Sequence, residues 1–245
     1  MNFFLVYLVC TVVLVLFLFK QYRVKNDICI LLTTTVSVKK DMQFVAQSDK
    51  DERVQTYLKA IRKWLRNTDY KVVVVENSGY TFEELGKEKI KYKDRFEVIT
   101  FTEETLKGAE YLKEITNKGD HEVFAVRYAY EHSKLLQDSD FIIKITGRYY
   151  IPGLQSYLQR THLKQYHAIS QSDSGRCELI GCSNEAFPMM FDLNMEDANG
   201  YNAHAESVYK YRMTKKIESK ELLVLPTFSI DPTQRGGVPE IFTTI

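Results

Sequence analysis

The stretch Asp140-Phe-Ile-Ile-Lys-Ile-Thr-Gly-Arg-Tyr-Tyr-Ile-Pro-Gly153 decides the fold class of this chain. It predicts a buried β-strand at 141–145 that runs into a turn at Gly147 and delivers Lys144 and Arg148 to the strand end. In open α/β sheets, ligands bind in the crevice beyond the carboxyl ends of the strands. These cations are therefore candidates for binding phosphate, although a plain surface turn with an ordinary arginine gives the same pattern.

The chain on the amino side of this strand alternates between strands and helices. Short apolar runs predict three more buried strands at 28–32, 71–75 and 96–101. Apolar residues at helical spacing predict helices around 54–65 and 122–136. Strands separated by helices imply helices on both sheet faces, so we predict an α/β fold: a three-layer sandwich with a mainly parallel sheet and a Rossmann-like nucleotide-binding half.

The order of elements after Pro152 is less regular. The patterns there predict two helices, at 154–163 and 202–213, and two short strands, at 167–170 and 178–182, with a final apolar run at 222–225. Arg235-Gly-Gly237 is interpreted as part of a flexible tail, with a segment that closes over a ligand as the alternative.

An uncharged apolar run at residues 3–19 comes close to the length that crosses a hydrocarbon core. Because no basic start or small-x-small cleavage site is evident before Lys25, we expect an uncleaved signal-anchor, a single transmembrane helix, with residues 1–26 forming the anchor and its basic flank. Lys20 and Arg23 also follow the run, so the body of this single-pass protein is expected in the cytosol. A lumenal body, as in type II proteins of the ER or Golgi, is the alternative.

Composition excludes some partners. The chain has 33 basic and 32 acidic side chains and a formal net charge of +1, so we expect no nucleic-acid partner. The four cysteines and five histidines show no zinc-ligand spacing, and we predict no metal site from them.

Three segments resemble compact GT-A-type glycosyltransferases, which occur in bacterial surface-polysaccharide loci and in large DNA viruses. The resemblance covers about residues 27–183 and is carried by the threonine-rich first strand end, by Val-Val-Glu-Asn-Ser-Gly79 after the second strand and by Lys-Ile-Thr-Gly-Arg-Tyr149 at the fourth. It implies one GT-A-like domain over 27–245, with a nucleotide-sugar half at 27–153 and an acceptor half at 154–245. It also implies transfer of a sugar from a nucleotide-sugar donor to a glycan, lipid or protein acceptor.

A transferase of this kind must neutralise the charge that grows on the departing nucleotide diphosphate. Most GT-A enzymes use Mg²⁺ or Mn²⁺ held by Asp-x-Asp at a strand end, but here that string occurs only at Asp138-Ser-Asp140, before its strand, and is interpreted as a turn. We therefore expect Arg148, with Lys144 or Lys107, to replace or supplement the metal as a phosphate clamp, and leave a divalent metal open. Strand alternation equally allows Lys144 to lie beneath a helix.

The remaining candidates bind the donor or act on the acceptor. At the ends of the first two strands, hydroxyl, amide and carboxylate groups suit a ribose and a base edge, although the same residues also finish a strand and make a turn. The donor-binding candidates are Thr33, Thr34, Thr35, Arg53, Glu76, Asn77, Lys107, Lys144 and Gly147.

An inverting transferase also needs a group that takes the proton of the acceptor hydroxyl. With Arg148, the catalytic candidates are Asp192 and Glu206, among other acidic residues and His204 in the C-terminal half. A catalytically inactive GT-A-like binding or scaffolding module is the alternative function. A P-loop enzyme is disfavoured because the segment 33–39 contains no glycine.

Overall fold

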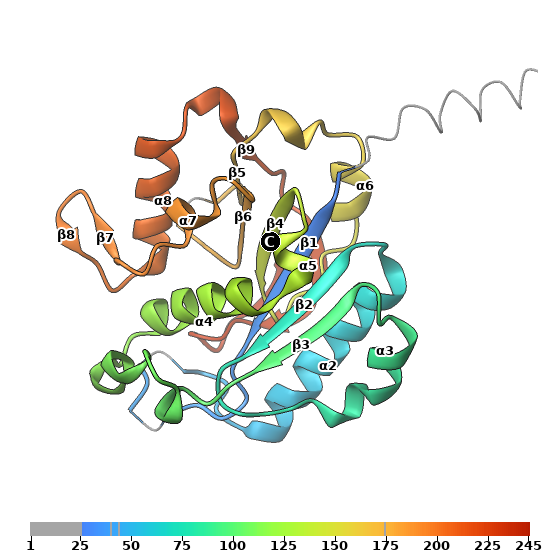
Figure 1. Cartoon of the computed structure of the whole chain (residues 1–245), viewed down its shortest axis with the longest axis vertical. Coiled ribbons are helices and arrows are strands. Elements are labelled where there is room, and N and C mark those ends of the chain that lie inside the picture. Colours follow the sequence, from blue (N-terminus) through green and yellow to red (C-terminus); the bar gives the residue numbers. More distant parts are fainter. Residues whose placement is uncertain (1–25, 40, 44, 174) are drawn as a thin grey trace, which may run out of the picture.

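The computed structural model describes residues 26–245 except 40, 44 and 174. A seven-stranded sheet forms its centre, with the order β3-β2-β1-β4-β6-β5-β9 (Figure 1). The neighbours β3, β2, β1 and β4 are parallel, β6 is antiparallel to both β4 and β5, and β9 is parallel to β5. The predicted mainly parallel α/β sheet is confirmed. The strands of this sheet are β1 (Ile28–Thr34), β2 (Lys71–Glu76), β3 (Phe96–Thr100), β4 (Phe141–Thr146), β5 (Ala168–Ser170), β6 (Leu179–Ser183) and β9 (Leu222–Val224).

Helices cover both faces of the sheet, which makes the three predicted layers (Figure 1). The long helix α2 (Lys50–Asn67) packs on one face, and α4 (Lys118–His132), α5 (Lys134–Gln137), α7 (Phe187–Met190) and α8 (Ala205–Lys216) pack on the other. The remaining elements are α3 (Gly86–Lys91), α6 (Leu154–Leu158), the hairpins β7 (Glu196–Asp197)–β8 (Gly200–Tyr201) and β10 (Ser229–Gln234)–β11 (Ile241–Thr244), and five 3-10 turns at Glu83–Leu85, Glu103–Thr105, Glu110–Glu114, Leu163–Gln165 and Ser219–Glu221.

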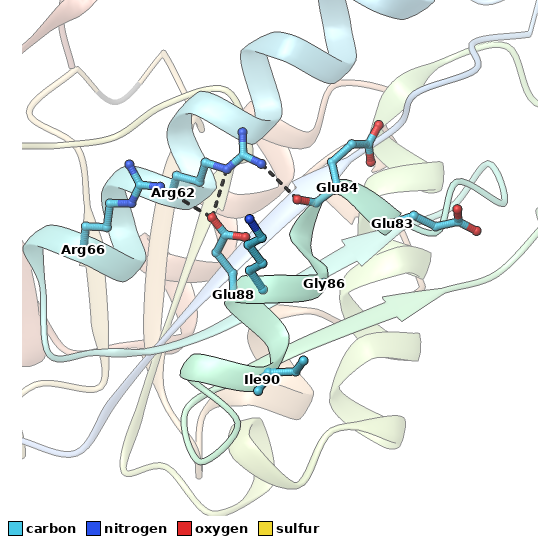
Figure 2. A pocket seen from close by; sticks show the side chains of 8 residues that line it. Arg62, Arg66, Glu83, Glu84, Gly86, Glu88 and Ile90 are labelled. Atoms are coloured by element: carbon cyan, nitrogen blue, oxygen red, sulfur yellow. Dashed lines mark hydrogen bonds and ion pairs between the residues drawn. The ribbon is translucent and has the colours of Figure 1, made fainter.

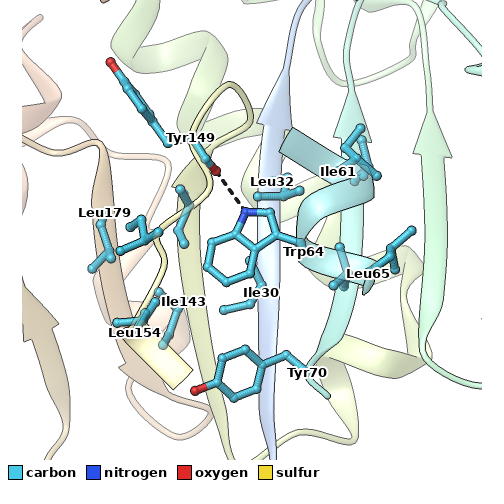
Figure 3. Close-up of a cluster of buried hydrophobic side chains, with 14 of the residues drawn as sticks. Ile30, Leu32, Ile61, Trp64, Leu65, Tyr70, Ile143, Tyr149, Leu154 and Leu179 are labelled. Atoms are coloured by element: carbon cyan, nitrogen blue, oxygen red, sulfur yellow. Dashed lines mark hydrogen bonds between the residues drawn. The ribbon is translucent and has the colours of Figure 1, made fainter. Parts of the chain in front are cut away.

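The strands alternate their apolar side chains between two cores because both sheet faces are covered. Ile30 and Val74 belong to the core under α2, whereas Leu31 and Val73 belong to the core under α4 and α8. Trp64 of α2 is fully buried in the first core, and its indole nitrogen donates a 2.9 Å hydrogen bond to the carbonyl of Tyr149 (Figure 3). This bond ties α2 to the turn that follows β4.

The ends of the parallel strands β1 to β4 lie together at one edge of the sheet, here called the carboxyl edge. Gly147 anchors the turn after β4 there, because its N–H donates a 2.8 Å hydrogen bond to the carbonyl of Thr33. The beginning of β6 lies at the same edge, since the N–H of Thr146 donates a 2.8 Å bond to the carbonyl of Glu178. The turn after β4 is therefore held by chain segments on both sides.

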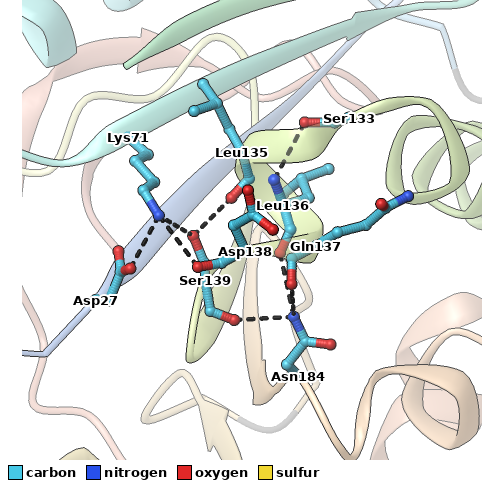
Figure 4. Close-up of polar contacts among 9 residues, drawn as sticks. All are labelled: Asp27, Lys71, Ser133, Leu135, Leu136, Gln137, Asp138, Ser139 and Asn184. Carbon is cyan, nitrogen blue, oxygen red and sulfur yellow. Dashed lines mark hydrogen bonds and ion pairs between the residues drawn. The ribbon is translucent and has the colours of Figure 1, made fainter. Parts of the chain in front are cut away.

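The Asp138-Ser-Asp140 string precedes β4 and therefore lies at the opposite edge, as its interpretation as a turn predicted. Figure 4 shows the polar contacts of Asp138 and Ser139. Asp138 caps the end of α5, and its carbonyl accepts a 3.3 Å bond from Lys71 Nζ. The side-chain amide of Asn184 donates a 2.8 Å bond to the carbonyl of Ser139. These bonds fix the beginning of β4, and the string plays no part at the carboxyl edge.

The C-terminal segment is more ordered than predicted. The Arg235-Gly-Gly237 segment is the turn of the β10–β11 hairpin, so the expectation of a flexible tail is wrong. β10 also carries Asp231, which forms ion pairs with Lys63 and Lys59 of α2. Ion pairs between residues so far apart in the sequence could not be predicted from local sequence patterns.

The predicted membrane anchor at residues 3–19 lies outside the described residues. In the part of the chain that the structure does describe, no helix combines the length and the apolar character that a bilayer span requires. This finding goes against the predicted single-pass localisation, cytosolic or lumenal, and we withdraw that prediction.

Gly147 offers a test of how the carboxyl edge is packed. A Cβ atom there would lie 2.5 Å from Thr34 Cγ2 and 2.8 Å from the Thr33 carbonyl oxygen, so Gly147→Ala should lower the free energy of unfolding by about 1–3 kcal/mol. Gly86→Ala is the matched control, since an added Cβ there meets nothing within 4 Å. Urea unfolding of the two variants measures the difference, and equal stabilities would contradict the close approach of β1.

Candidate functional site

Arg148 lies at the centre of the carboxyl edge with its guanidinium buried. Its side chain is held by neutral oxygens: Nη1 donates to Gln47 Oε1 at 3.1 Å and to the carbonyl of Gln234 at 3.4 Å. Its Nε has no hydrogen-bond partner. Among the described residues, no ion pair within 4.0 Å neutralises Arg148, which is unusual for a buried guanidinium.

Arg53, in the first turn of α2, is a second buried cation with neutral partners. Its three nitrogens donate to the carbonyls of Thr35 and Gln47, at 2.6 and 2.7 Å, and to the Tyr57 hydroxyl at 2.8 Å. Burial lowers the pKa of Arg53, and the nearby charge of Arg148 lowers it further. Arg53 thus fixes the chain after β1 and adds positive charge to the carboxyl edge.

Lys118, at the beginning of α4, is the third member of this group, which we call the cation cluster (Arg53, Lys118 and Arg148). Its Nζ donates to the carbonyl of Gly236 at 3.5 Å. Burial, followed by the charges of Arg148, Arg53 and Arg235, lowers the pKa of Lys118 to about 8, while Glu206 acts in the opposite direction. Lys118 was not among the residues that we predicted from the sequence. A usable signal was a lysine directly after the N-cap Asn117, where the helix dipole disfavours a cation.

The turn of the β10–β11 hairpin covers the cation cluster. The carbonyl of Gly236 accepts a 3.0 Å bond from the N–H of Ala46 as well as the bond from Lys118. A Cβ atom on Gly236 would lie 2.7 Å from Arg148 Nη2, so the turn backbone rests directly on the guanidinium. Beside this contact, Arg148, Gln47 and Tyr150 line a cavity of about 280 Å³ together with residues of the hairpin. The C-terminal segment therefore completes the site.

The predicted donor-binding residues of β1 are brought together at this edge, with different partners. Thr34 is buried and donates to the carbonyl of Val75 at 2.8 Å, and Thr33 reaches Glu122 Oε2 at 3.4 Å. Thr35 donates to Asn77 Oδ1 at 2.6 Å. Thr35 and Asn77 thus form a side-chain hydrogen bond between the ends of two adjacent strands.

Glu76 has a structural task at the same edge. Its fully buried carboxylate accepts hydrogen bonds from the backbone N–H groups of Val36, Ser78 and Tyr80, at 2.8, 3.0 and 2.7 Å. The Ser78 hydroxyl also donates to it. This carboxylate is saturated, so Glu76 positions the loops after β1 and β2.

Asn77 is held by a buried chain of polar groups that the sequence analysis did not foresee. Its amide donates to Glu103, and the other oxygen of Glu103 lies 2.6 Å from His121 Nδ1. His121 Nε2 faces the carbonyl of Ile115 at 3.0 Å, so both ring nitrogens have acceptors. Burial alone would lower the pKa of His121, but the bonds to Glu103 and Ile115 outweigh it and raise the pKa.

Lys144 lies beneath α4 and α8, outside the cation cluster. Its ammonium group is fully buried, lies 2.5 Å from Glu122 Oε1 and donates to the carbonyl of Cys177 at 2.8 Å. Burial opposes the charge, but Glu122 outweighs it and raises the pKa of Lys144. Lys144 thus links β4 to α4 and to the segment before β6, and it contributes to the packing of the sheet.

The two acidic candidates lie in different places. Glu206, in the first turn of α8, lies close enough to Lys118 to act on its pKa. Asp192 is exposed; its carboxylate accepts a bond from the N–H of Asn194 at 3.0 Å, and its carbonyl binds Arg212. Lys107 is exposed between two 3-10 turns. Among the described residues, no hydrogen bond or ion pair joins Lys107 or Asp192 to the cation cluster.

The groups at the carboxyl edge do not fit a divalent metal. Among residues 26–245, leaving out positions 40, 44 and 174, no group of three or more His, Cys, Asp or Glu side chains is arranged to hold a metal ion. The cation cluster presents guanidinium and ammonium groups, which are the opposite of the oxygen ligands that Mg²⁺ requires. We derive no step through a metal.

A second hollow, of about 720 Å³, lies between α2 and α3 (Figure 2). Its two arginines are already paired, since Glu88 accepts from Arg62 Nε at 3.0 Å and lies 3.6 Å from Arg66 Nη2. It lies away from the strand ends, so we place the functional site at the cation cluster and not in the larger hollow.

Comparison with known proteins identifies the fold. No protein-family model and no curated protein sequence matches this chain. The glycosyltransferase GlyE of Streptococcus pneumoniae TIGR4, in its apo form, is similar in structure, with a TM-score of 0.51, 9% identity, and coverage of 83% of this chain and 46% of GlyE. A second GlyE structure has a TM-score of 0.50 and 9% sequence identity, and the match covers 82% of this chain and 45% of GlyE. A candidate nucleotide-diphospho-sugar transferase from Desulfovibrio desulfuricans G20 has a TM-score of 0.45 and 17% sequence identity. The match covers 82% of this chain and 80% of that protein.

This chain spans slightly under half of the length of GlyE. At such identities the likeness shows the fold alone. GlyE is a glycosyltransferase, so the predicted resemblance to GT-A-type glycosyltransferases is confirmed for the fold.

The raised pKa of His121 predicts a pH dependence of stability. The charged imidazolium stabilises the fold fully below the ordinary pKa of about 6.5, and this contribution is lost as the pH rises through the raised folded-state value. Urea unfolding of the wild type and of His121→Gln should therefore differ most near pH 6 and converge at alkaline pH. His162→Gln, at an exposed position, is the control. An NMR titration that gave His121 an ordinary or lower pKa would contradict this account.

Proposed function

We propose that this chain is a glycosyltransferase that moves a sugar from a nucleotide-sugar donor to a carbohydrate or glycoconjugate acceptor, with the donor pyrophosphate bound at the cation cluster. The single observation that carries the proposal is the gathering of Arg53, Lys118 and Arg148 around neutral oxygens at the carboxyl edge of a GT-A-like sheet. Like charges that are kept out of water repel one another, and an anion placed between them relieves that repulsion.

The same cations suit the chemistry of sugar transfer. Negative charge grows on the nucleotide diphosphate as its bond to the sugar breaks, and fixed positive groups at that place stabilise the transition state. Arg148 supplies a planar fork that binds two phosphate oxygens at once. Lys118 adds a compact charge beside it. In this proposal the carbonyls of Gln234 and Gly236 now occupy the positions that phosphate oxygens take.

The other residues predicted from the sequence differ in their roles in this proposal: some contact the donor, and others only hold the loops of the site. Thr35 and Asn77 contact the nucleoside, because they offer a hydroxyl and an amide at the ends of β1 and β2. Thr33, Thr34, Glu76 and Gly147 hold the loops that carry those groups, and Lys144 supports the sheet below them. Glu206 is our candidate for the acceptor's general base, since it lies near Lys118, whereas Asp192 and Lys107 receive no role.

A non-catalytic binding module with this fold is the second candidate, and one experiment separates the two. Purified protein is titrated calorimetrically with UDP-, GDP- and CMP-sugars, and the products are analysed by mass spectrometry with and without EDTA. Sugar transfer or donor hydrolysis supports the enzyme, while binding without turnover supports the module. Absence of binding to every donor would refute both.

Arg148→Ala tests the phosphate clamp. Loss of charge-assisted hydrogen bonds, each contributing about 1.5–3 kcal/mol, should weaken binding of the matching nucleoside diphosphate by about 10- to 100-fold. Arg160→Ala is the matched control, because Arg160 is exposed on the turn after α6. Titration calorimetry provides the measurement, and unchanged affinity in Arg148→Ala would remove the clamp from the proposal.

Lys118 predicts the pH dependence of donor binding. Because its pKa is lowered to about 8, Lys118 loses its charge as the pH rises above that value, and affinity for the nucleoside diphosphate should fall there. Lys118→Arg keeps its charge throughout and should flatten the profile. Affinities measured between about pH 7 and pH 9.5 test this, and identical profiles for the two proteins would count against Lys118 as a phosphate ligand.

A further inference from the structure

A second group of polar atoms beside the cation cluster lacks hydrogen-bond partners. These atoms are Tyr149 Oη, Gln171 Nε2 and Arg176 Nη2, together with Nε of Arg148. Tyr149 and Gln171 are buried, with exposed fractions of 1% and 4%. Buried polar groups in proteins are nearly always paired, so several unpaired donors in one region indicate that acceptor atoms are missing there.

The three side chains are fixed on adjoining segments of the carboxyl edge. Gln171, directly after β5, accepts a 2.8 Å bond from the N–H of Leu179 with its Oε1, so the amide nitrogen must find its partner elsewhere. Tyr149 lies in the turn after β4, which pairs with the segment before β6. Burial raises the pKa of Tyr149 to about 12, and Glu178, Arg148 and Arg176 all lie close enough to act on it.

Each oxygen of the nearby Glu178 carboxylate already has an arginine partner. Glu178 accepts from Arg176 Nε at 3.1 Å through one oxygen and pairs with Arg235 Nε at 3.0 Å through the other. Phe242 of β11 lies against both guanidinium groups, with its ring centre 4.4 Å from Arg176 Cζ and 5.6 Å from Arg235 Cζ. The region therefore offers fixed donors and more positive than negative charge, because three arginines (Arg148, Arg176 and Arg235) lie near the one carboxylate of Glu178.

We propose that Tyr149, Gln171 and Arg176 bind a carboxylate carried by a sugar, so that the substrate class of this protein is an acidic sugar such as a uronic acid. A carboxylate has two oxygens with about four acceptor sites and no hydrogen to donate, which matches a place that offers donors. A water molecule would bring two hydrogens that themselves need acceptors. The inference rests on the proposed function, because the subsite adjoins the seat of the donor pyrophosphate.

Matched donor pairs test the inference. UDP-glucuronate is compared with UDP-glucose, and GDP-mannuronate with GDP-mannose, by titration calorimetry alongside free UDP and GDP. For the pair with the correct base, the acidic sugar should bind at least about tenfold more tightly than the neutral one, as expected for a charge-assisted hydrogen-bond set. Free glucuronate and free glucose, added in the presence of the nucleoside diphosphate, show whether the carboxylate belongs to the acceptor instead.

Variants distinguish binding at this carboxylate subsite from binding of the pyrophosphate at the cation cluster. Tyr149→Phe and Gln171→Leu should abolish the preference for the acidic sugar while leaving affinity for the nucleoside diphosphate unchanged, and Tyr157→Phe of α6 is the control. Equal binding of acidic and neutral sugars in both the donor and the free-sugar comparisons, with nucleoside diphosphate binding intact, would overturn the subsite and leave the proposed function standing. If no nucleoside diphosphate binds, the proposed function fails, and failure of free glucuronate to bind better than glucose then overturns the subsite as well.

Discussion

The arrangement of this site depends on one constraint, which is that the guanidinium groups of Arg53 and Arg148 are held close together and away from water by neutral oxygens. Arg148 and Arg53 share Gln47 as a partner, through its side chain and its carbonyl, and Lys118 reaches the same place from α4. Such an arrangement is unfavourable without an anion. This electrostatic cost is the reason why the cation cluster is our candidate binding site.

The fold makes this convergence possible by drawing on segments that are far apart in the chain. The parallel strands β1, β2 and β4 bring their ends to one edge, and Gly147 lets the turn after β4 approach β1 closely. The β10–β11 hairpin, near the C-terminus, then covers the cation cluster, and its Gly236 lies against Arg148. If the donor binds as we propose, the hairpin must move when the ligand binds and when it leaves, because Gly236 and Gln234 contact Arg148.

Most of the sheet could be predicted from the sequence because each buried strand is a short apolar run. The position of Arg148 followed from the same pattern. Its partners could not be predicted, because Gln47 and Gln234 are separated from it by about a hundred residues. Glu76 was correctly placed at the carboxyl edge, but three backbone N–H groups use its carboxylate, and no sequence pattern reports such bonds. Lys118 and the Glu103–His121 pair were missed because they depend on how the loop after β3 folds over the edge.

A crystal structure of the protein with its best-binding nucleoside diphosphate tests the central claim most directly. The account predicts diphosphate oxygens within hydrogen-bonding distance of Arg148 and Lys118, with the turn at Gly236 moved away from the guanidinium. A diphosphate bound elsewhere, for example in the hollow between α2 and α3, with Arg148 still covered by the hairpin, would contradict it.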